Sequence, residues 1–486
     1  MHRAPVGLAD EARGQMEAAR ALVEHAAENT YGVNTGFGRF VSESIPDDQV
    51  DELQLRLLRS HACGVGEPYP DEIVRAALLM RANTLAKGYS GTRPEVAERL
   101  LDCLAHGVLP EVPSRGSVGA SGDLAPLAHL ALPLVGEGQA WFEGTLLPGD
   151  EALAAAGLEP VRLGAKEGLS LINGTQFMAA MASLALVRAW RLARTADLAC
   201  ALSLESLQGS RTSFHPAIHQ ARPLPGQVDS AANLHRLLEE SAIIESHRWC
   251  DRVQDAYSLR CAPQVHGASK DGIRYALEVL VTEANSVTDN PLVFADGDVI
   301  SGGNFHGQPV SQALDFLAIA VSTLANISER RIEQMVNPDI SGLPPFLARN
   351  PGLESGFMIP QVVAASLASE NKSLAHPASV DTIPTSANRE DHVSMGVTAA
   401  RHADRVVGNT AKVLGIEVLC AAQGLDLGEQ LRPGKGVAAA YKALRKRVAG
   451  LEGDRYLAPD LAVAEELVVD GTLVAAAEKA AGVLAV

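Results

Sequence analysis

One group of residues whose types could do chemistry lies in a loop dense in glycine, serine and proline. Residues 116–127 read GSVGASGDLAPL. Taken alone, the stretch could be a flexible glycine-rich loop, or a helix N-terminus capped by Ser121 or Asp123. A phosphate cradle is a weaker alternative, because neither a following lysine nor a GxGxxG pattern after a strand is present. The tripeptide Ala120-Ser121-Gly122 does not indicate a function by itself, and other parts of the chain are needed to interpret it.

A tyrosine and an arginine form a second pair with suitable chemistry. They lie in QDAYSLRCAPQVHG, residues 254–267. Tyr257 precedes Arg260 by three residues, so the two side chains would share one face of a helical turn. The planar fork of an arginine suits a carboxylate, which it can bind through two hydrogen bonds. A surface ion pair is the alternative for Arg260 taken alone.

Further sequence blocks, spread from Tyr31 to about Asp426, carry a resemblance to a known family. They are YGVNTGFG at 31–38, SHACGVGEP at 60–68, LINGTQ at 171–176, DNPL at 289–292, GGNFHGQP at 302–309, SGFMIPQ at 355–361 and SANREDHVSM at 386–395. With the loop and the tyrosine-arginine block, in this order, they resemble the histidine and aromatic amino-acid ammonia-lyases. In that family an Ala-Ser-Gly tripeptide cyclises into the electrophile 4-methylidene-imidazol-5-one.

The resemblance implies that Ala120, Ser121 and Gly122 form this electrophile, and their residue types suit the reaction. The Gly122 nitrogen would attack the Ala120 carbonyl across a tight kink, and glycine has no Cβ to obstruct that approach. Ser121 would lose its hydroxyl as water and leave an exocyclic methylidene, with Asp123 placed to assist. The cofactor would then be made from the backbone, and no metal or diffusible cofactor is expected.

The resemblance also implies roles for residues distant from the loop. Tyr31 matches the proposed base, although a phenol titrates at about 10 and the site would have to lower that pKa. Arg260 would pair with the substrate carboxylate, and Tyr257 would lie near the electrophile. The other matches would contact the substrate or line its pocket: His61, Asn173, Gln254, Phe305 and Met358.

The expected reaction is the conversion of L-histidine to trans-urocanate and ammonia, a step of histidine breakdown. His61, preceded by serine, resembles the pair in histidine lyases, and Glu390 stands where phenylalanine and tyrosine lyases tend to have Gln. A carboxylate can accept an imidazole N–H, whereas beside a phenyl ring it would be desolvated without a partner. Glu390 is also an alternative to Tyr31 as the proton acceptor. Gln308 is commoner in the tyrosine and phenylalanine branches, so a tyrosine ammonia-lyase or tyrosine 2,3-aminomutase is the alternative.

Two further alternatives belong to other classes of protein. A lyase of the fumarase and argininosuccinate type would share a helical bundle, but its GSSxMPxKxN loop is absent from the sequence. A non-catalytic homologue is disfavoured, because Tyr31, Ser121, Tyr257, Arg260 and Glu390 are all present.

The composition excludes several kinds of partner. The formal net charge is −17, which argues against binding to nucleic acid or to an anionic membrane. The six cysteines are far apart and form no CxxC pattern, so neither a zinc site nor a disulfide framework is suggested. The first residues, MHRAPVGLADEARGQ, lack the apolar run of a signal peptide. We therefore expect a cytoplasmic enzyme with a small-molecule amino-acid substrate.

The elements that must position these residues are expected to be mostly α-helices. Aromatic residues make up only 4% of the chain, while the abundant alanine and leucine favour closely packed helices. The sequence WFEGTLL predicts a small hairpin within residues 136–165. Hydrophobic periodicity predicts helices over 10–27, 47–58, 71–87, 176–208, 266–286, 309–336, 360–371, 393–423 and 437–448.

The predicted architecture is a long-helix bundle of the ammonia-lyase/fumarase type with a mixed N-terminal part. Residues 1–175 would carry the electrophile loop, and residues 176–486 would form the bundle and a helical C-terminal end. Residues 309–328 are apolar on every face, which predicts a place at the centre of the bundle or between subunits. The family forms homotetramers in which three subunits contribute to each active site, so we expect a homotetramer with shared active sites.

Overall fold

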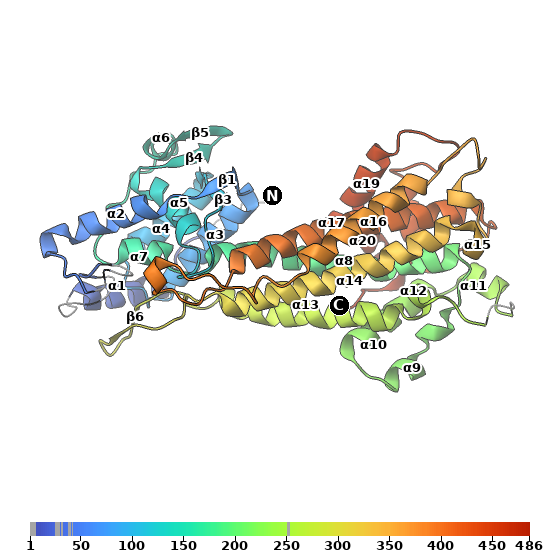
Figure 1. Ribbon diagram of the computed structural model, residues 1–486, viewed down its shortest axis with the longest axis horizontal. Helices are drawn as coiled ribbons and strands as arrows, with labels where there is room; N and C mark the ends of the chain where they lie inside the picture. The colour runs from blue at the N-terminus through green and yellow to red at the C-terminus, as the bar shows by residue number, and fades with distance from the viewer. Residues whose placement is uncertain (1–5, 25–29, 31–32, 37–39, 41, 250–252) are drawn as a thin grey trace. The chain divides into compact units, whose positions relative to one another are not determined.

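The structure is a computed structural model that describes residues 6–24, 30, 33–36, 40, 42–249 and 253–486 (Figure 1). The prediction of a mostly helical chain is confirmed. The chain divides into two compact units, each built from separate stretches of sequence. Unit 1 comprises residues 1–184, 278–314 and 377–401, and unit 2 comprises residues 185–277, 315–376 and 402–486. The predicted boundary near residue 175 stays a prediction.

Unit 1 contains short helices and small antiparallel sheets. Its helices are α1 (Asp10–Glu24), α2 (Val50–His61), α3 (Asp71–Ala86), α4 (Pro94–His106), α5 (Leu124–Ala131), α6 (Gly149–Ala155) and α7 (Glu167–Ile172). Their apolar residues recur at helical spacing, as in α4, where one face buries Val96, Leu100 and Leu104 against α3. The helices α2, α5 and α7 pack on one another, and this cluster positions the site described below.

The strands of unit 1 form three sheets. They are β1 (Val65–Pro68) paired with β3 (Pro113–Arg115), β2 (Leu109–Pro110) beside β4 (Gln139–Phe142) and β5 (Thr145–Pro148), and β6 (Leu292–Val293) paired with β7 (Val299–Ile300). The predicted hairpin is confirmed, because β4 and β5 pair in antiparallel register. Glu143 and Gly144 connect them with positive φ angles of 47° and 81°, as a two-residue hairpin turn requires.

The long helices predicted from the sequence are present, and their ends lie within a few residues of the predicted ones. They are α8 (Gln176–Ser206), α13 (Ala262–Ala284), α14 (Gln308–Val336), α16 (Met358–Leu374) and α17 (Gly396–Leu427). Shorter helices complete unit 2: α9 (Pro216–Gln220), α10 (Pro225–Leu237), α11 (Ala242–Ser246), α12 (Tyr257–Arg260), α15 (Pro338–Ser341), α18 (Lys435–Arg445), α19 (Ala458–Val469) and α20 (Thr472–Ala481).

Helix α14 is buried on only part of its surface. Val310, Leu317 and Leu324 are fully buried, but Phe316 and Ile319 are 48% and 44% exposed. The helix is therefore not buried on every face by the described part of this chain. Within that part, α14 is the one helix long and apolar enough to cross a membrane, and 72% of its apolar window is buried in the protein. Such burial is typical of a core helix.

Buried ion pairs tie the helices of unit 2 together. Asp197 on α8 accepts hydrogen bonds of 2.7 Å from both His266 and Lys270 on α13. Arg331 on α14 pairs with Glu417 on α17 through both carboxylate oxygens. All five side chains are fully buried. Removing one partner from such a pair would leave an uncompensated buried charge.

Candidate active site

A cavity of about 970 Å³ in unit 1 brings together several residues that the sequence singled out. His61 is the last residue of α2, Ser121 lies just before α5, and Asn173 follows α7. Two more come from loops distant in sequence, Phe305 before α14 and Glu390 before α17. All five line the cavity: His61, Ser121, Asn173, Phe305 and Glu390. The mutual packing of α2, α5 and α7 explains why three of them meet here.

Ser121 and Glu390 are in direct contact. The Ser121 hydroxyl donates to Glu390 Oε1 at 3.0 Å. The other carboxylate oxygen accepts a hydrogen bond of 2.6 Å from the Thr385 hydroxyl. Thr385 and Glu390 also exchange main-chain hydrogen bonds of 3.0 and 3.3 Å, so a tight turn holds the carboxylate against the loop. A fixed carboxylate beside Ser121 can accept a proton or bind a positively charged ring.

The backbone at Gly122 is bent and closely packed. Its φ of +78° lies in the left-handed region, and a Cβ at this position would collide with the Gly174 carbonyl oxygen. The same carbonyl accepts the Asp123 N–H at 2.7 Å, which fixes the loop against the end of α7. Glycine is therefore required at this point. A small residue at 120, a hydroxyl at 121 that faces the cavity and a glycine at 122 all fit the cyclised tripeptide.

Asp123 is fully buried behind the loop. Its carboxylate accepts a hydrogen bond of 2.9 Å from the Met178 N–H and a longer one from the Ser117 hydroxyl. Burial raises the pKa of this carboxyl to about 7, against the effect of these hydrogen bonds. The alternative of a capped helix is wrong, because Asp123 makes no side-chain capping bond to α5 and the Ser121 hydroxyl binds Glu390.

His61 faces the cavity as a neutral ring with a defined tautomer. Its Nδ1 lies 2.9 Å from the Leu57 carbonyl oxygen, which can only accept, so Nδ1 carries the proton and Nε2 is left as an acceptor. Burial lowers the pKa of His61, although the hydrogen bond to Leu57 and the charge of Glu390 oppose this shift. Asn173 is 3% exposed, and its Oδ1 accepts no hydrogen bond from the protein groups that the structure describes. Both residues can thus offer an acceptor to a bound molecule.

Four other predicted site residues lie in unit 2 and do not line this cavity. Tyr257 and Arg260 form α12, and the Arg260 guanidinium carbon lies 4.6 Å from the centre of the Tyr257 ring. The predicted shared face is thus confirmed, and the tyrosine is 70% exposed. Met358 begins α16, and Gln254 lines a separate cavity of about 460 Å³. Their roles stay predictions, as does that of Tyr31, which lies outside the described residues.

The sequence did not point to two residues that hold the site in place. Thr385 fixes Glu390, and Arg81 on α3 donates to the Asn173 carbonyl oxygen at 2.9 Å. Thr385 belongs to no recognisable pattern. Arg81 had one signal, since it is the only charged residue in the stretch AALLMRANTLA.

Comparisons with known proteins identify the family of the chain. The family described as aromatic amino acid lyase matches residues 1–446. The histidine ammonia-lyase of Gloeobacter violaceus is 58% identical over 483 residues, which cover 98% of this chain and 94% of that protein. The crystal structure of histidine ammonia-lyase from Trypanosoma cruzi is similar with a TM-score of 0.90 at 45% identity, covering 97% of this chain and 90% of that one. The structure of tyrosine aminomutase from Streptomyces globisporus is similar with a TM-score of 0.94 at 37% identity, covering 99% of this chain and 96% of that one. The chain belongs to the aromatic amino acid lyase family.

Proposed function

We propose that this chain removes ammonia from L-histidine and releases trans-urocanate. The observation that carries the proposal is the Glu390 carboxylate, 3.0 Å from the Ser121 hydroxyl in the wall of a cavity. An imidazole N–H can donate to this carboxylate, which would also stabilise positive charge on the ring. The relatives named histidine ammonia-lyase, at up to 58% identity over nearly the whole chain, support the same substrate.

The proposal includes an electrophile made from Ala120, Ser121 and Gly122. This group would supply the electrophilic chemistry that makes the substrate nitrogen a better leaving group. The chain must supply the rest of the chemistry. Glu390 or Tyr31 would accept the β-proton, and Asp123 would assist the cyclisation of the loop from its buried position.

Other residues would bind and orient the amino acid. Arg260 would hold the substrate carboxylate in its planar fork, with Tyr257 beside it. The rest of the pocket would consist of His61, Asn173, Gln254, Phe305 and Met358. Tyr257 is exposed in the isolated chain, which supports a homotetramer whose subunits share each active site. A cytoplasmic location, without a nucleic-acid or membrane partner, belongs to the same proposal.

An ultraviolet assay of the purified protein with L-histidine and, separately, L-tyrosine tests the proposal. We expect urocanate from histidine and no product from tyrosine, because the Glu390 carboxylate can stabilise positive charge on an imidazole ring, which a phenol does not carry. Coumarate or β-tyrosine would overturn the substrate and favour the tyrosine enzymes, whose fold is equally similar. Ser121→Ala is the control: it cannot lose a hydroxyl, so it should be inactive with an unchanged circular dichroism spectrum.

The variant Glu390→Gln tests the substrate assignment separately. Glutamine keeps the size of the side chain and can still accept from the Thr385 hydroxyl, so we expect the melting temperature to change little. Glutamine lacks the negative charge that stabilises a positively charged imidazole ring. A charge-assisted hydrogen bond contributes about 1.5–3 kcal/mol to the free energy of such an interaction. We therefore expect kcat/KM for histidine to fall by about tenfold to a hundredfold. An unchanged kcat/KM would contradict the assignment.

A further inference from the structure

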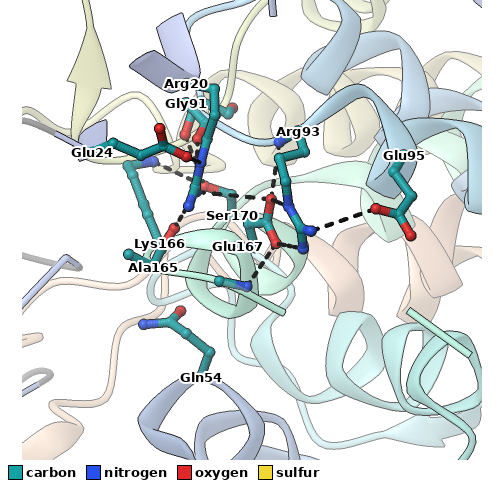
Figure 2. A network of polar contacts seen from close by, with 12 residues as sticks. Arg20, Glu24, Gln54, Gly91, Arg93, Glu95, Ala165, Lys166, Glu167 and Ser170 are labelled. Carbon is teal, nitrogen blue, oxygen red and sulfur yellow. Dashed lines mark hydrogen bonds and ion pairs between the residues drawn. The ribbon is translucent and has the colours of Figure 1, made fainter. Parts of the chain in front are cut away.

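The short helix α7 begins at a buried ion pair. The Glu167 carboxylate is fully buried and accepts hydrogen bonds of 2.9 and 2.7 Å from Arg93 Nε and Nη2. Figure 2 shows Arg93 and Arg20 gathered around Glu167, and Arg20 also donates to the Ala165 carbonyl oxygen at 2.8 Å. These contacts fix the start of the helix, and none of the four residues that make them lines the cavity.

A fully buried cation holds the other end of α7. Arg81 is fully buried, and its guanidinium donates to the carbonyl oxygens of Ser170 and Asn173. The Arg81 Nη1 atom, which donates to Asn173, also donates to the Gln176 side-chain oxygen at 2.8 Å. Gln176 is itself fixed, because its amide nitrogen donates to the Thr84 and Thr288 hydroxyls at 3.1 and 2.7 Å. One side chain thus gathers the last turn of α7 and the first residue of α8.

The residue between these anchored groups is Gly174, which touches the electrophile loop. A Cβ on Gly174 would collide with Arg81, Gln176 and the Thr288 carbonyl, so the backbone is packed directly on this cluster. On its other side, the Gly174 carbonyl accepts the Asp123 N–H and abuts Gly122. The position of Gly122 relative to Ala120 therefore depends on where Arg81 holds the end of α7.

We propose that Arg81 is a positioning residue for the formation of the electrophile; the inference rests on the proposed function. In that reaction a bond forms between the Gly122 nitrogen and the Ala120 carbonyl carbon. The Ala120 oxygen leaves as water with the amide protons of Gly122 and Ser121. A second water takes the Ser121 hydroxyl and its Cα proton. Arg81 touches none of these atoms and acts through Asn173 and Gly174.

Removing Arg81 would free the end of α7. The Ser170 and Asn173 carbonyls and the Gln176 oxygen would lose a buried donor, and the Gly174 carbonyl would no longer be held against Gly122. Intramolecular attack depends steeply on the distance between the reacting atoms, and a displacement of about 1 Å can slow it by about 100-fold. Formation of the electrophile should therefore slow more than the fold is weakened.

Intact mass spectrometry of the folded, full-length protein measures this directly, because cyclisation removes two molecules of water. We expect the wild-type chain to have lost both waters. In Arg81→Lys, which keeps the charge but not the fork, we expect the cyclised fraction soon after synthesis to fall by about tenfold or more. Gln176→Ala leaves Arg81 in place but removes an acceptor that orients it, and should give an intermediate fraction.

Arg331→Lys is the matched control, since Arg331 is another fully buried arginine, paired with Glu417 in unit 2. It should lower the melting temperature yet leave both waters lost. The inference is wrong, while the proposed function stands, if both variants fold and lose the two waters as fast as the wild-type protein. The two variants are Arg81→Lys and Gln176→Ala. A wild-type chain that has lost neither water would overturn both the proposed function and this inference.

Discussion

Burial, more than any hydrogen bond, sets the chemistry of Asp123. The carboxyl is fully buried beside the electrophile loop, and burial raises its pKa from 3.8 to about 7. In the unfolded chain the same group is in water and loses its proton at lower pH. Between these two values the folded state binds more protons than the unfolded state, so its stability falls as the pH rises. Well above pH 7 both states have lost the proton and the contribution is constant.

The variant Asp123→Asn should remove this dependence on pH. Each pKa unit corresponds to about 1.4 kcal/mol, so the carboxyl destabilises the protein by at most about 4 kcal/mol at pH 7 relative to pH 4. The variant and its reference should both also carry Ser121→Ala, so that neither forms the electrophile. We expect the melting temperature of the Asp123→Asn variant to rise relative to its reference between pH 4 and 7. A difference that does not change with pH would contradict the raised pKa.

At the residue scale, motif resemblance predicted several of the side chains that face the cavity but not what holds them. Ser121, His61 and Glu390 were identified because their blocks have distinctive neighbours, and they do gather around one cavity. Thr385 and Arg81 hold that arrangement through hydrogen bonds to a carboxylate and to a main-chain carbonyl. Such contacts join residues far apart in sequence or lack a characteristic spacing, so a single sequence carries little trace of them.

At the element scale, α7 depends on its surroundings. It has only six residues, and helices shorter than about 12 residues are marginal in water. Buried charges therefore hold it: Glu167 is bound by Arg93 at the start, and Arg81 binds the carbonyls at the end. The helix carries Leu169 and Ile172 into the cavity wall. Its stability and the geometry of the site are thus linked.

Glu167→Gln should destabilise the protein by about 3 kcal/mol. The change leaves Arg93 and Arg20 without their buried counter-charge and places an amide where an acceptor is needed. Glu137→Gln is the matched control, because Glu137 also binds an arginine, Arg59, through both oxygens, but at the surface. That variant should change stability by about 1 kcal/mol or less. Equal shifts in melting temperature for the two variants would show that α7 is not held in this way.

Hydrophobic periodicity predicted the helices better than it predicted their surroundings. The ends of the long helices and the hairpin were close to those observed, because caps, turns and periodic apolar residues are local signals. The sequence predicted a place for α14 at the centre of the bundle or between subunits, and it did not indicate that the described part of this chain leaves Phe316 and Ile319 exposed. Periodicity reports which residues are apolar, whereas burial depends on which elements cover each face.

At the scale of the whole molecule, unit 1 is assembled from distant stretches of the chain. Residues 278–314 and 377–401 join the N-terminal part, and they bring Phe305 and Glu390 to the cavity. Contacts between stretches this far apart leave no periodicity in the sequence, so only the family resemblance pointed to them. Arg260 and Tyr257 lie in unit 2. In the proposed homotetramer, residues of unit 2 would complete the site of another subunit.

Co-expression of two inactive chains tests this sharing of sites. Ser121→Ala removes the electrophile, and Arg260→Ala removes the proposed carboxylate clamp, so each homotetramer should be inactive with histidine. In mixed tetramers some sites would combine an intact loop from one chain with an intact Arg260 from another. Random assembly from equal amounts gives about a quarter of the sites intact, and about a quarter of wild-type activity. The two proteins mixed after separate assembly should stay inactive. Every chain carries one defect, so a site that takes both its loop and its Arg260 from one chain is always inactive. Inactive co-expressed protein would therefore show that sites are not shared in this way.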